Sequence, residues 1–165
     1  ITLLQLGQVV DFAKGRCHEW RDLEPQTLSE TSGKTLHISF LNFYHLNSWV
    51  VRPATKEKKC SMAELLAVAW QRPDWFISHW WGEPLLNFLR CIECLRKARQ
   101  LGEAACFWVY AFSSSHYEQE DNINPNLREM SFYRAMEVAG FKVLLILNEA
   151  MQHDNHESAP RVEPG

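Results

Sequence analysis

The sequence lacks the features that mark several large classes of protein. Its 17 basic and 20 acidic residues give a net charge of −3, and without clustered basic charge it is not expected to bind nucleic acid. Its longest apolar run, around residues 143–147, is too short to span a bilayer. No basic leader precedes an apolar stretch and a cleavage site, so no secretory signal is indicated. We therefore expect an intracellular protein, cytoplasmic or in an organelle.

The sequence also lacks a disulfide framework and the common catalytic signatures. Five cysteines without a repeated spacing are typical of reduced thiols in an intracellular protein. Cys91 and Cys94 match C-x-x-C, which can serve redox or metal chemistry. The pair falls in the middle of a predicted helix and no second pair follows, so we predict structural thiols and no metal site. Glycine-rich phosphate-binding motifs and the nucleophile elbow are absent.

The residues that are present predict one α/β domain. Apolar residues make up 46% of the 165 positions, with seven tryptophans and nine phenylalanines, enough for a substantial core. From residue 75 onward, apolar strands and amphipathic helices alternate. The predicted elements are strands 75–79, 106–112 and 141–147, a helix from Pro84 that Gly102 ends, and a helix over 127–139. This order predicts a small parallel sheet of flavodoxin-like β-α-β-α-β topology.

Helices are predicted before the sheet. The candidates are residues 1–14, ended by Gly15; a short aromatic helix from Ser39 or Asn42 to Trp49, stopped by Pro53; and a helix that a Ser61–Glu64 capping box begins and that continues to Trp70. We expect residues 1–72 to form a helical extension packed on the sheet. Residues 73–150 form the α/β core, and 151–165 a loose tail.

The segment Trp75–Pro84 is the most informative part of the chain. A strand ends there in Ser78 and His79, followed by two tryptophans, a glycine, an acid and a helix start. Ligands of open α/β sheets collect at such turns, beside free N–H groups at helix N-termini. The predicted crevice comprises Ser78, His79, Trp80, Trp81, Gly82, Glu83, Ser113, His116, Asn148 and Glu149.

Within this crevice, His79, Glu83 and His116 are the candidates for acid–base chemistry on a nucleotide. The structural alternative stays open. In that case His79 bonds the backbone, the indoles fill the top of the core, and Glu83 stabilises the helix dipole.

The segment Phe76–Leu147 resembles a Toll/interleukin-1 receptor (TIR) domain, which opens with an aromatic–aliphatic–Ser–His or –Tyr strand. The blocks Leu46–Thr55, Cys60–Leu65 and Trp75–Pro84 more closely resemble a large family of uncharacterised protist proteins, chiefly of dinoflagellates. Some TIR domains hydrolyse NAD through a glutamate in the helix after the third strand, near a Trp-Cys pair. Residues 151–165 contain no Trp or Cys, and Glu157 and Glu163 are the only acids loosely suited.

These observations predict a TIR-like intracellular interaction or regulatory module, without complete catalytic machinery, that serves as a subunit of a larger assembly. A three-stranded sheet exposes an edge through which a protein partner or a second copy can bind. The alternative is a nucleotide-binding enzyme, resembling an NAD hydrolase, that uses the crevice with NAD or another nucleotide.

Overall fold

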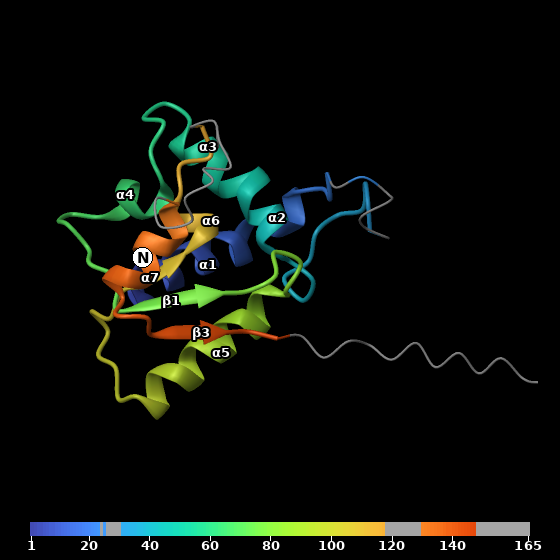
Figure 1. Cartoon of the computed structure of the whole chain (residues 1–165). Helices are drawn as coiled ribbons and strands as arrows, with labels where there is room; N and C mark the ends of the chain where they lie inside the picture. Colours follow the sequence, from blue (N-terminus) through green and yellow to red (C-terminus); the bar gives the residue numbers. More distant parts are fainter. Residues whose placement is uncertain (24, 26–30, 118–129, 148–165) are drawn as a thin grey trace, which may run out of the picture.

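The computed structural model describes residues 1–23, 25, 31–117 and 130–147. Its centre is a sheet of three strands, β1 Trp75–Ser78, β2 Phe107–Val109 and β3 Val143–Leu145, in the order β2-β1-β3. Both pairings are parallel, with Ile77 opposite Val109 on one side and Leu144 on the other. The predicted α/β class and the three parallel strands are confirmed (Figure 1).

One face of the sheet is covered by the main hydrophobic core. The helices α1 Leu3–Arg16 and α5 Leu85–Ala98 pack here, together with the short helix α2 Phe43–Leu46. Ile77 and Val109 of the sheet are buried against the apolar stripe of α5. A stripe of this kind gains stability only when the facing element removes it from water. The N-terminal helices and the sheet therefore share one core.

The opposite face is covered by α7 Ser131–Val138. Ala135 and Ala139 pack on Phe76, whose ring stacks on Trp108 with centroids 4.7 Å apart. Figure 1 shows α5 and α7 on opposite sides of β1. The helix predicted over 127–139 is therefore present at Ser131–Val138, and residues 127–129 of the predicted range lie outside the described residues.

The two edges of the sheet differ. The outer side of β2 is paired with the first residues of the chain: the Ile1 ammonium donates to the Phe107 carbonyl at 2.9 Å, and the Phe107 N–H donates back to the Ile1 carbonyl. Thr2 forms an antiparallel bridge with Cys106. In the described part of the chain, nothing pairs with the outer side of β3. That strand is therefore the open edge.

Two predicted elements near the sheet end earlier than expected. β2 stops at Val109, and Tyr110–Ser113 forms the helix α6 instead of continuing the strand. The Ser113 hydroxyl accepts the Val109 N–H at 3.2 Å, which closes this turn. Likewise α5 ends at Ala98, before Gly102, because Gln100 adopts the left-handed conformation at φ 52°.

Helix boundaries in the N-terminal half also differ from the prediction. Gly15 lies inside α1, and Pro53 does not stop the aromatic helix. The π-helix η2 Asn47–Val51 follows α2 and leads into α3 Arg52–Thr55, where proline is tolerated in the first turn. The capping box begins α4 Met62–Leu66 as predicted, but Ala67 turns extended, so Trp70 lies outside the helix and exposed. The 3-10 turn η1 Cys17–Glu19 follows α1.

Candidate functional site

Backbone hydrogen bonds fix the turn between β1 and α5. Its own Glu83 N–H donates to the Trp80 carbonyl at 3.1 Å. Two further bonds tie it to the start of α2: the Phe43 N–H donates to the Trp81 carbonyl at 2.9 Å, and the Leu85 N–H donates to the Leu41 carbonyl at 2.7 Å. The N-terminal helical segment therefore positions the turn that the sequence singled out.

His79 lies beneath this turn, among aromatic rings. Its ring centroid is 4.2 Å from that of Phe43 and 4.9 Å from that of Phe88. Nδ1 lies 3.0 Å from the Trp80 carbonyl, so Nδ1 carries the proton in the neutral ring. Nε2 is buried and has no hydrogen-bond partner. Burial lowers the pKa of His79, partly opposed by the bond to the Trp80 carbonyl. The backbone bond is the one that the structural alternative predicted.

Trp80 and Gly82 lie in close contact. A Cβ atom built on Gly82 would lie 2.3 Å from an indole carbon of Trp80, which is far inside van der Waals contact. Only a glycine permits this approach. The indole itself is 60% exposed. It therefore folds back over its own turn at the surface and does not fill the top of the core.

Trp81 belongs to an aromatic cluster at the carboxyl ends of β1 and β2. Its ring meets Tyr44 edge-on at 5.4 Å, Tyr110 at 5.9 Å and His116 at 5.8 Å. His116 Nε2 bonds the Ala111 carbonyl at 3.0 Å, which fixes the imidazole against α6. The structure thus brings Trp81 and His116 together, as the predicted crevice required. Tyr44 and Tyr110 complete the cluster, although sequence reasoning did not include them.

Glu83 is an acid with only 3% of its surface exposed, at the entrance to α5. Burial and the nearby Glu83 carboxylate both raise the pKa of Cys91, which keeps this thiol protonated. Cys91 is half-buried, Cys94 is exposed, and both are free. Within the described ranges, no three His, Cys, Asp or Glu side chains gather to hold a metal ion.

Of the four remaining crevice residues, the structure describes Ser78 and Ser113. Ser78 ends β1, and its carbonyl accepts the Ile146 N–H. Ser113 lines a hollow of about 240 Å³ with Ile1, Ser61 and Phe107, beside β2. Asn148 and Glu149 lie outside the described residues. The geometry thus supports an aromatic cluster around Trp81 and leaves the wider crevice a prediction.

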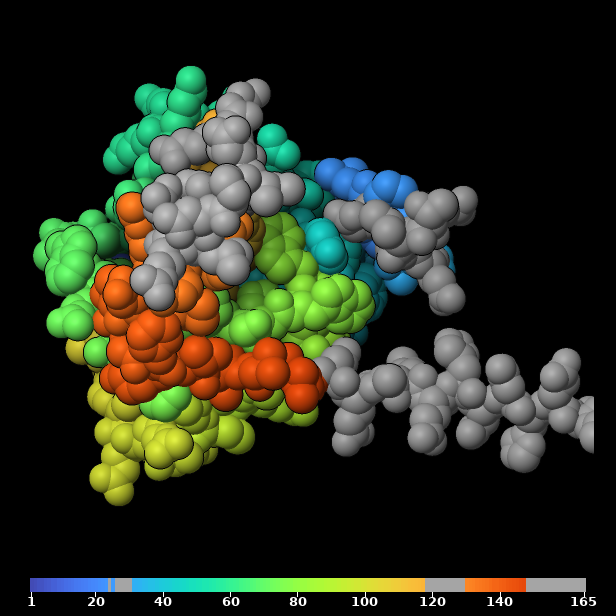
Figure 2. Space-filling model, in the orientation of Figure 1, coloured from blue at the N-terminus to red at the C-terminus, as the bar shows by residue number. Residues whose placement is uncertain are grey.

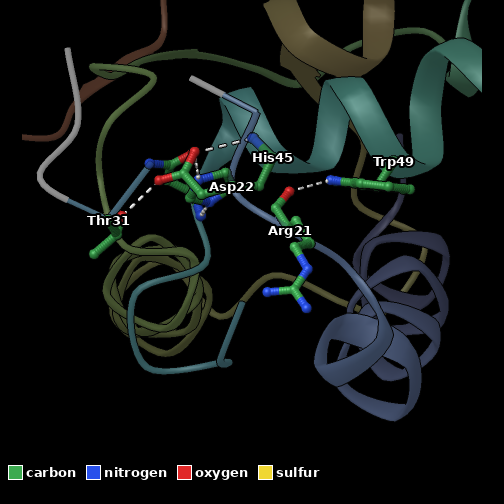
Figure 3. A network of polar contacts seen from close by, with 6 residues as sticks. Arg21, Asp22, Thr31, His45 and Trp49 are labelled. Carbon is green, nitrogen blue, oxygen red and sulfur yellow. Dashed lines mark hydrogen bonds and ion pairs between the residues drawn. The ribbon is translucent and has the colours of Figure 1, made fainter. Parts of the chain in front are cut away.

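A buried polar network that sequence reasoning missed joins the loop after η1 to α2 (Figure 3). His45 Nε2 lies 3.2 Å from Asp22 Oδ1, with both side chains almost fully buried, and the Thr31 hydroxyl donates to Asp22 Oδ2 at 2.5 Å. His45 Nδ1 accepts the Asn42 N–H, so Nε2 carries the proton toward Asp22. The cap spacing of Asn42 and His45 was a local signal; nothing in the sequence indicated Asp22.

This network is a structural support for the site. It holds α2 in place, and α2 supplies Phe43 against His79 and Tyr44 against Trp81.

Among the described helices, none has the length and apolar character to cross a membrane. The chain matches no protein-family model, no curated protein sequence and no solved structure.

Proposed function

We propose that this chain is a TIR-like intracellular interaction or regulatory module that joins a larger assembly through the open edge of β3. The strand order β2-β1-β3, with α5 and α7 on opposite faces, is the arrangement with which flavodoxin-like folds begin. The observation that carries the proposal is the open, apolar edge.

The exposed side chains of this edge share one face of the sheet. Val143, Leu145 and Leu147 are 42%, 58% and 77% exposed. Val143 lies opposite Phe76, but α7 covers Phe76 and leaves Val143 bare. Figure 2 shows the red segment around β3 at the surface. Strands that are apolar on both faces are typical of sheet interiors. A partner that extends the sheet would bury this row.

The backbone of β3 is also ready to pair. The Phe76 N–H donates to the Lys142 carbonyl, and the Ile146 N–H donates to the Ser78 carbonyl. Even-numbered residues of β3 therefore bond to β1, and the N–H and C=O groups of Val143 and Leu145 point outward. An extended partner segment would satisfy these groups, as in strand-addition complexes.

The nucleotide enzyme ranks second. His79 is packed between two phenylalanines, and His116 bonds a carbonyl. These two candidate acid–base groups are thus held in structural contacts. Incubation of the chain with NAD tests this alternative. We expect no nicotinamide release, and turnover that His79→Ala or Glu83→Ala abolishes would replace our proposal with the enzyme.

Photo-crosslinking in living cells, from a photoreactive residue placed in this chain, tests the edge. A benzoylphenylalanine at position 147 would lie on the bare row, and one at Leu4, which is exposed on α1, serves as the matched control. We expect one discrete adduct from position 147 and none from position 4. Leu145→Pro removes an outward N–H without touching the bonds to β1, and should abolish the adduct. Equal adducts from both positions, no adduct, or an adduct that survives Leu145→Pro would contradict the proposal.

A further inference from the structure

A second surface is formed entirely by helices. A groove of about 530 Å³ runs between α1, the η2–α3 segment and α4. Val9, Val50 and Met62 are buried and form its floor, and Trp49 and the two leucines of α4 form its walls. Of the described residues that line it, all but Gln8 are apolar. Its volume is in the range of protein ligand sites.

The walls of the groove are fixed before anything binds. The Trp49 indole N–H donates to the Arg21 carbonyl at 2.8 Å, which Figure 3 shows beside the Asp22 network. The same indole stacks on Trp20, with centroids 6.0 Å apart and the planes 1° from parallel. A π-helical segment brings Trp49 and Val50 to the groove, and such segments are frequent at functional sites. A preformed wall lowers the cost of binding.

The charges near the groove are mostly positive. Arg52 precedes the groove-lining Pro53, and the turn after α3 holds three lysines and Glu57, all exposed. On the α1 side, the exposed Asp11 and Lys14 offset each other. A partner that crosses the α3 side therefore meets an excess of cations, and acidic side chains there would be attracted.

We propose that this groove binds an amphipathic helix of a partner protein, with apolar residues at i, i+3 or i+4 and i+7 and acidic residues along one flank. The walls are helical segments and contain no β-strand, so an added strand would find no edge to pair with. A helix satisfies its own backbone and needs only the apolar contacts that the groove offers. The site is separate from β3 and does not depend on the proposal for that edge.

Two fluorescent peptides of about 18 residues, long enough for several helical turns, test the chemistry of the partner. They share one leucine face and carry either glutamates or lysines on its flank. Fluorescence anisotropy with the whole chain should show the glutamate peptide binding at least about tenfold more tightly than the lysine peptide, with the difference shrinking at high salt. Equal affinities, or no binding of either peptide, would overturn the proposal.

Three variants of the chain test whether the peptide binds in the groove. Ala54→Trp fills the groove from an exposed position and should weaken binding of the glutamate peptide by at least about tenfold. Lys56→Glu should weaken it by about fivefold, whereas Arg90→Glu, the same reversal on an exposed site of α5 outside the groove, should leave it unchanged. Circular dichroism confirms that each variant folds. Unchanged binding to Ala54→Trp, or equal losses from both charge reversals, refutes the site. Leu145→Pro should have no effect here, which separates this test from that of the β3 edge.

Discussion

Adding a glycine at the end of one helix and removing one at the end of another should change stability in opposite directions. Helices α5 and α7 end in the same Schellman motif, with a left-handed residue just past each helix: Gln100 at φ 52° and Gly140 at φ 63°. After α7 a second left-handed residue, Phe141 at φ 57°, follows the glycine. Matching hydrogen bonds close both motifs: Leu101 to Arg96 and Gln100 to Lys97 after α5, and Phe141 to Met136 and Gly140 to Glu137 after α7. One motif has the residue that the conformation favours, and the other does not.

The magnitude follows from the backbone alone. The left-handed conformation costs a residue with a Cβ about 1–2 kcal/mol, while the extra freedom of glycine in the unfolded chain offsets about 0.4–1 kcal/mol. Gln100→Gly should therefore raise the free energy of unfolding by about 0.5–1 kcal/mol. Gly140→Ala should lower it by a similar amount, because a Cβ at Gly140 meets no atom within 4 Å and adds no clash.

Urea unfolding measures both effects. Each variant should shift the midpoint urea concentration without changing the slope of the unfolding free energy against urea. In thermal unfolding, the midpoint temperature should move by about 1–3 °C. Gly102→Ala is the control, since Gly102 has no left-handed φ and its neighbourhood is open. If Gln100→Gly destabilises the protein, or if Gly140→Ala does nothing, the two helix ends do not have the conformation described.

Three other perturbations probe the site. Burial lowers the pKa of His79, so below pH 6.5 the unfolded chain binds more protons and the free energy of unfolding should fall as the pH drops; NMR titration with a midpoint above 6.5 would contradict this. Gly82→Ala should swing the Trp80 indole away at a cost of about 1 kcal/mol or less, visible as a shift of its indole N–H resonance, and an unshifted resonance would argue against the close contact. His45→Phe removes the buried polar contact between His45 and Asp22 and should cost about 2 kcal/mol in urea unfolding, whereas a loss under about 0.5 kcal/mol would mean that the pair does not hold the loop.

Features set by neighbours in the sequence could be predicted. The Ser61–Glu64 capping box needs only a spacing of three residues, and the predicted bonds form at 3.2 Å and 2.8 Å. The three strands were identifiable because each is a short apolar run flanked by turn residues. The proximity of Trp81 and His116 could be predicted from the parallel topology, since the carboxyl ends of β1 and β2 lie at the same edge of the sheet.

Features set by distant contacts could not be predicted. Tyr110–Phe112 is as apolar as a strand, and its helical conformation depends on the core in which Ala111 and Phe112 are buried. The end of α5 depends on where Leu101 packs, which overrides the preference of Gly102 for a cap. The pairing of Asp22 with His45 joins a loop without periodicity to the helix α2, and no local pattern brings them together.

The bonds that Ile1 forms with Phe107 tie residues that lie 106 positions apart along the chain, and Thr2 and Cys106 pair beside them. The three strands are likewise joined only through long crossovers. Closing such loops costs entropy before the contacts form, so the chain should fold slowly compared with a helical bundle of its length. Until folding is complete, the apolar strands of one molecule can associate with those of another. Dilution during refolding should therefore raise the recovered yield.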